Sequence, residues 1–94
     1  MKIYQYDIGT LFQLDVGEDV TDATTTEIKV KYPDATTDTW TATVNDDDNN
    51  IIEYATVTGD LDQVGQHYIR AYIVLPAWGG HGETKEFWVH EAWR

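Results

Sequence analysis

The side chains that could carry covalent catalysis are scarce in this chain. It contains no serine and no cysteine, so a serine nucleophile elbow and a cysteine–histidine pair are excluded, and only threonine could supply a hydroxyl nucleophile. The histidines at positions 67, 81 and 90 are too far apart in the sequence to form a local zinc pair. Residues 90–94 begin like the helical motif of metalloproteases, but Arg94 stands where the second histidine is required. We therefore expect a protein without enzymatic activity, catalytic metal or cofactor.

Carboxylates are the remaining candidates for chemistry. Because the chain has seventeen Asp and Glu, two of them fall near each other by chance, and a glycosidase-like pair carries little information. Asp46, Asp48 and Asn50 imitate the first oxygen ligands of a calcium loop. Ile51 and Val57 stand where that loop needs a glycine and a bidentate glutamate. We interpret this polar block as a solvated turn, while a weak calcium site formed with another loop stays open.

The charge balance restricts the classes of partner. Six Lys and Arg against seventeen Asp and Glu give a formal net charge of -11 at pH 7. Nucleic acid and anionic membranes would be repelled, so we expect neither as a partner. No apolar run has the length of a signal peptide or reaches the roughly 20 residues of a membrane helix. Because cysteine is absent, the redox compartment stays open.

The repeating pattern of the chain is that of β-strands. Short runs rich in Val, Ile, Thr, Tyr and Trp recur between turn residues, and no helical period is sustained. Residues 28, 30 and 32 alternate with charged residues, and the next run returns through Trp40, so the two are predicted to form a hairpin around Pro33 and Asp34. About seven strands are predicted. They cover residues 2–6, 10–16, 27–32, 39–44, 51–58, 66–75 and 83–90.

The pattern within these runs predicts which side chains are buried. Trp40 is the best candidate for the central ring of the core. Residues 66–75 are largely apolar or aromatic on both faces, which is typical of a strand in the middle of a sheet, and His67 is expected to be half-buried there. In the last run Phe87 and Val89 are predicted to face inward, which places Trp88 on the opposite face.

These features predict the fold class. We expect one domain over residues 1–94, an all-β, immunoglobulin-like antiparallel β-sandwich of about seven strands. Residues 62–68 look like the entry to a late sandwich strand, where a tyrosine corner often lies. At the position where a tyrosine corner has its tyrosine, this chain has His67, and Tyr68 follows one residue later. Whether the corner hydrogen bond forms stays open.

Four tryptophans suggest a binding surface. Trp78 lies in a glycine-rich segment, residues 76–82, which we predict to be a turn, and Trp88 and Trp93 lie near the end of the chain. Exposed there, they would form an aromatic platform for a sugar or a protein. The structural alternative is that Trp40 and one other tryptophan are in the core, while Trp78 packs over one end of the sandwich. The predicted partner-binding residues are Trp78, His81, Trp88, His90 and Trp93.

Several weak motifs follow one another along the chain in a definite order and spacing. They are residues 7–10, 19–23 and 28–34, Trp40, residues 59–61, Gly65, and residues 87–89. In this order and spacing the sequence resembles a family of small bacteriophage proteins related to the immunoglobulin-like domain at the amino end of baseplate upper proteins. That family commonly has a glycine after the Pro-Asp pair, where this chain has Ala35. The baseplate proteins also carry long carboxy-terminal extensions, which this sequence lacks.

The resemblance implies a structural protein of a phage virion, made in the host cytoplasm. The missing extension favours an accessory role, either decorating the head or joining the tail and baseplate, and the choice between head and tail stays open. Its partners would be capsid or tail and baseplate subunits, with self-association possible, contacted through strand edges, the segment 76–82 and the terminal segments. The alternative is a carbohydrate- or surface-binding module that uses the exposed tryptophans.

Overall fold

The computed structural model describes residues 2–82 and 84–92, and in that part of the chain it contains nine β-strands and no helix. The predicted all-β fold class is confirmed. The strands are β1 (Ile3–Tyr4), β2 (Leu11–Asp15), β3 (Thr25–Lys31), β4 (Thr37–Thr41), β5 (Thr43–Val44), β6 (Ile51–Ala55), β7 (Gly65–Leu75), β8 (Trp78–His81) and β9 (Lys85–His90).

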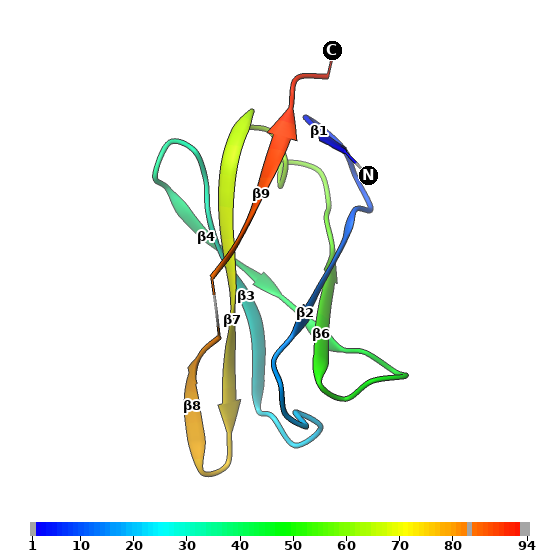
Figure 1. The fold of residues 1–94 in the computed structure, drawn as a ribbon, viewed down its shortest axis with the longest axis vertical. Coiled ribbons are helices and arrows are strands. Elements are labelled where there is room, and N and C mark those ends of the chain that lie inside the picture. Colours follow the sequence, from blue (N-terminus) through cyan, green and yellow to red (C-terminus); the bar gives the residue numbers. More distant parts are fainter. Residues whose placement is uncertain (1, 83, 93–94) are drawn as a thin grey trace.

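The strands form two sheets, which Figure 1 shows as two layers. The larger sheet has the order β1-β9-β7-β3-β4, and β8 pairs with the far half of β7. The smaller sheet has the order β2-β6-β5. All ladders are antiparallel except β1 with β9, which is parallel. Strand β7 pairs with β3 on one side and with β8 and β9 on the other, so its predicted central position is confirmed.

The core lies between the two sheets. Trp40 on β4 is 2% exposed, and its ring stacks on Tyr54 of β6 with centroids 4.9 Å apart, so its predicted role as the central ring is confirmed. Ile28 of the larger sheet and Ile52 of the smaller are fully buried. Burying such a side chain contributes about 1.5–3 kcal/mol, and without a disulfide this packing must hold the layers together.

Two details of the strand prediction were wrong. Trp78–His81 is a strand, not a turn, because it pairs in register with the end of β7 (Leu75 opposite Trp78), and backbone hydrogen bonding outweighs the glycine content. The run 39–44 is not one strand. It passes from the larger sheet to the smaller at Ala42, which is held by hydrogen bonds to Thr26 through its N–H (3.0 Å) and its C=O (2.7 Å).

His67 is fully buried rather than half-buried as predicted. Strand alternation places it on the inner face of β7, where Phe87 stacks on its ring at 4.9 Å and Tyr32 meets it edge-on at 5.5 Å. Its Nδ1 lies 3.1 Å from the carbonyl oxygen of Gly65, and its Nε2 has no hydrogen-bond partner among the described residues. Burial lowers the pKa of the imidazole because the charged form loses its hydration.

The predicted hairpin between β3 and β4 is confirmed, and its turn is strained. The Tyr32 N–H donates to the Thr36 carbonyl at 2.9 Å, so the loop itself contains Pro33, Asp34 and Ala35. Ala35 has φ of 73°. Three-residue hairpin loops end in this left-handed conformation, for which glycine is the usual residue. Ala35 therefore occupies the position where the resembling family commonly has glycine.

The tyrosine corner considered at residues 62–68 is not formed, and a side-chain hydrogen bond of another tyrosine is present before this segment. Tyr68 is 39% exposed on the outer side of β7 and makes no corner. Instead, the Tyr54 hydroxyl donates to Oδ2 of Asp60 at 2.5 Å, and the Val57 N–H donates to the same oxygen at 2.9 Å. Burial and the neighbouring Asp60 carboxylate raise the pKa of Tyr54. This side-chain bond ties β6 to the loop before β7.

Candidate functional site

The candidates for metal binding can be compared with the structure in the part of the chain that it describes. No group of three His, Asp or Glu side chains there is placed to hold a metal ion. Residues 46–48 are exposed in a turn, where Asn45 Oδ1 accepts the N–H groups of Asp47 (2.8 Å) and Asp48 (3.0 Å). The predicted solvated turn is therefore present. No helix of the described chain could span a membrane.

The most distinctive surface is the outer face of the larger sheet, the face turned away from the core. In β7 the residues at odd positions from His67 to Ile73 are buried, so those at even positions point outward, and residues opposite them on β3, β8 and β9 share their face. We call this surface the outer face. It is formed by Gln66, Tyr68, Arg70, Tyr72 and Val74 of β7, Glu27, Lys29 and Lys31 of β3, His81 of β8, and Glu86, Trp88 and His90 of β9.

One half of the outer face is aromatic. Trp88 is 52% exposed and lies opposite Gln66, diagonal to Tyr68, as the predicted alternation with Phe87 and Val89 requires. His81 lies opposite Tyr72, with ring centroids 4.8 Å apart. An exposed sheet face is usually polar, and clustered aromatic rings there leave apolar area in contact with water.

The other half carries positive charge, although the protein is strongly acidic. Lys29 and Arg70 lie directly opposite each other, and Lys31 lies opposite Tyr68. Like charges in opposed positions destabilise a sheet. Lys29 is partly neutralised by Glu27, at 3.2 Å, and its Nζ also lies 3.1 Å from the Thr39 hydroxyl oxygen and 5.1 Å from the centre of the Tyr72 ring.

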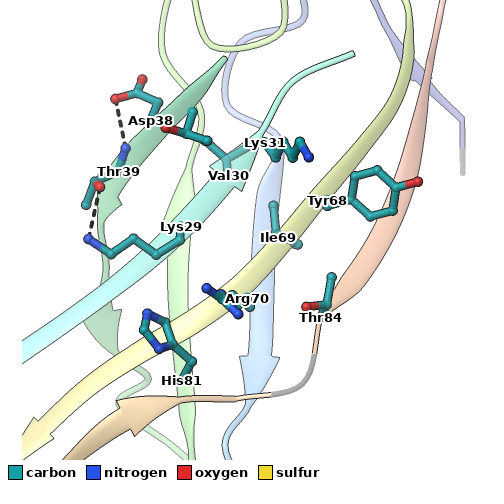
Figure 2. A pocket seen from close by; sticks show the side chains of 11 residues that line it. Lys29, Val30, Lys31, Asp38, Thr39, Tyr68, Ile69, Arg70, His81 and Thr84 are labelled. Carbon is teal, nitrogen blue, oxygen red and sulfur yellow. Dashed lines mark hydrogen bonds between the residues drawn. The ribbon is translucent and has the colours of Figure 1, made fainter. Parts of the chain in front are cut away.

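The side chains of Lys31 and Arg70 have no ion pair or hydrogen bond within the described part of the chain. They border a groove of about 560 Å³ over β3, β4 and β7, and Figure 2 shows them on the adjacent strands that form it. Among the described residues of its lining, Asp38 supplies the one carboxylate, which accepts hydrogen bonds from the Thr39 N–H at 2.8 Å and from the Tyr32 hydroxyl at 3.2 Å. Burial and the charge of Asp38 raise the pKa of Tyr32 to about 12.

The predicted partner-binding residues do not form one platform. Trp88, His90 and His81 lie on the outer face, where His90 contacts Tyr4 with ring centroids 5.8 Å apart. Trp78 is 50% exposed but lies opposite Leu75, in the row of β7 that faces the core layer, so it belongs to the other side of the sheet. Trp93 lies outside the described residues.

Sequence reasoning missed the cationic half of the outer face. Alternation in residues 27–32 already places Lys29 and Lys31 on the solvent-exposed side of the strand. A net charge of -11, however, predicts an acidic surface and gives no sign of a local positive cluster. That Arg70 lies beside Lys29 depends on the register of β3 against β7, which no local pattern reveals.

Comparisons of the chain with protein-family models, with curated proteins and with solved structures found no match. No relative therefore supplies a function, and the outer face is interpreted from its own chemistry.

Proposed function

We propose that this protein is a non-enzymatic structural protein that acts through protein–protein contacts made by its outer face. The observation that carries the proposal is the joint exposure of Trp88 and Tyr68 with Arg70 on one uncovered sheet face. Tryptophan, tyrosine and arginine are the residues most enriched at the energetic centres of protein interfaces. A surface rich in these residues is suited to bind another protein.

We further propose that the setting is a bacteriophage virion, with the chain as an accessory head-decoration or tail and baseplate component. Support for this setting comes from the sequence resemblance to baseplate-type immunoglobulin-like proteins, whose sandwich fold is compatible with the two sheets of this chain. An assembly protein needs a rigid scaffold with one adhesive face, and a two-layer sandwich provides both.

The test is to purify virions of the phage that encodes the chain, identify their proteins by mass spectrometry, and determine the particle structure by cryo-electron microscopy. We expect the chain at a repeating position with Trp88 in a contact. Trp88→Ala should reduce incorporation, whereas Val57→Ala, which truncates a side chain of similar exposure elsewhere, should not. Absence from particles contradicts the virion setting, and incorporation unaffected by Trp88→Ala contradicts the outer face.

A second candidate function, binding of a carbohydrate surface, is favoured by Trp78. A Cβ at Gly80 would lie 2.9 Å from the Trp78 ring, so the ring lies directly on the glycine backbone while half of the side chain stays exposed. A flat indole supported in this way can stack on a sugar ring. Glycan-array binding that Trp78→Ala abolishes and Trp88→Ala leaves intact would favour this function over the first.

A further inference from the structure

We propose that the groove between Lys31 and Arg70 binds the acidic turn, residues 45–50, of a second copy of this chain. The proposal rests on the proposed function and names the partner of the outer face. It begins with the charge pattern of the groove. Half of the six cationic side chains of the protein, Lys29, Lys31 and Arg70, line one groove, and two of them have no carboxylate partner in the described chain despite seventeen acids.

The lining of the groove defines the chemistry that it accepts. Its cations come from two adjacent strands and line the same groove together with His81 and Tyr68, as Figure 2 shows. Its volume of about 560 Å³ lies within the range of roughly 300–1,000 Å³ typical of binding sites. Lysine and arginine form charge-assisted hydrogen bonds with carboxylates, and arginine can hold one carboxylate with two hydrogen bonds.

A second copy of the chain carries those carboxylates. Outside the groove it has only three other Lys or Arg residues against seventeen acids, and its highest local density of acids is the run Asp46 to Asp48. All three side chains are exposed, and the carboxylates of Asp46 and Asp47 have no partner within the described residues. Groove and turn are thus complementary in charge, and the Lys31, Arg70, Asp46 and Asp47 side chains have no ion-pair partner among the described residues.

The groove and the turn are different surfaces of the protein. The groove lies on the larger sheet, and the turn joins β5 to β6 of the smaller sheet, at the lower right in Figure 1. Two grooves placed face to face would oppose positive charges, so a two-fold pairing through this surface is unfavourable. A groove-to-turn contact that is made only once between two copies leaves one groove and one turn free, and its repetition builds a ring or a filament.

Net charge limits the conditions under which the contact forms. Each copy carries -11, so two copies repel at long range. At an ionic strength of about 0.15 M the screening length is about 8 Å, which suppresses remote repulsion and leaves the close groove-to-turn contacts. At about 1 M it falls to about 3 Å, and the contact should weaken.

The test is sedimentation velocity of the full chain over a concentration series at near-physiological salt. We expect the wild type to associate, and both Lys31→Glu/Arg70→Glu and Asp46→Lys/Asp47→Lys to weaken association at least tenfold when each is alone. Mixing these two variants should restore it, because the acidic groove of one then meets the basic turn of the other. Restoration also demonstrates that both variants are folded.

Two matched controls separate the contact from net charge. Lys31→Glu should weaken association more than Lys2→Glu, and Asp47→Lys more than Asp62→Lys, although each pair changes the total charge equally; all four side chains are exposed. Equal effects within a pair overturn the proposal. So does failure of the mixed variants to associate.

The proposed function can survive the failure of this inference. Poly-L-glutamate serves as a probe of the groove in the same titration. A wild type that stays monomeric but binds the probe through Lys31 and Arg70 overturns the second copy as occupant and leaves the outer face as a docking surface for an acidic partner. The wild type could neither associate nor bind the probe in solution, while virions still incorporate the chain through a contact of Trp88. This pair of results overturns the role of the groove and leaves the proposed function standing.

Discussion

Replacing Ala35 by glycine should stabilise the protein. Ala35 adopts φ of 73° at the end of the β3–β4 loop. An L-residue in the left-handed region costs about 1–2 kcal/mol, and the extra freedom that glycine adds to the unfolded chain costs about 0.5–1 kcal/mol. The difference predicts a gain of about 0.5–1 kcal/mol, because the exposed position offers no packing to lose.

The assay is thermal and urea unfolding followed by circular dichroism. A gain of this size raises the melting temperature of a domain of under 100 residues by about 2–8 °C. Ala35→Asn should raise it as well, because asparagine tolerates the left-handed conformation without the flexibility of glycine. Ala55→Gly is the matched control: Ala55 is exposed in β6 with ordinary backbone geometry, so glycine there should destabilise by about 0.5–1 kcal/mol. A melting temperature that Ala35→Gly lowers or leaves unchanged refutes the strain at this turn.

Three further predictions concern the core and its borders. Because burial lowers the pKa of His67 below its ordinary value of 6.5, the unfolded chain binds the proton more readily; the resulting stability is present above about pH 6.5 and is lost as the pH falls. Urea midpoints should therefore fall less on acidification in His67→Gln than in the wild type, and equal slopes would contradict this. Tyr54→Phe removes a hydrogen bond to Asp60 and should cost about 1–3 kcal/mol in urea unfolding; a cost near zero would show that the bond is not formed in solution. Ile28→Ala should cost about 2–5 kcal/mol, whereas Val57→Ala at an exposed position should cost under about 0.5 kcal/mol, and similar costs would refute the assignment of the core.

Much of the fold follows from local pattern. Period-two alternation identified β3 and β7 and the inward positions of Phe87 and Val89, and the Pro-Asp pair located the hairpin turn. The same reasoning failed at Trp78–His81 because glycine content favours a turn locally, whereas pairing with β7 decides the outcome. It also failed to see that the chain changes sheets at Ala42, which depends on hydrogen bonds to a strand sixteen residues away in the sequence.

The candidate site, too, could be predicted from the sequence only in part. Alternation alone predicted the outward direction of Trp88, but it could not tell that Trp78 lies on the opposite side of the sheet, because that depends on how β8 pairs with β7. Nor could composition reveal a positive groove in a protein of net charge -11.

The sequence by itself determined that the protein is all-β, that Trp40 is in the core, and that the surface is acidic, because these properties follow from side-chain type and from a period of two residues. Only the tertiary structure decided that Lys29 lies opposite Arg70 and that an aromatic and a cationic half share one face. Register joins residues about forty positions apart, and a shift of one residue would turn every outward side chain of a strand inward. The register is therefore selected by the packing of the whole core.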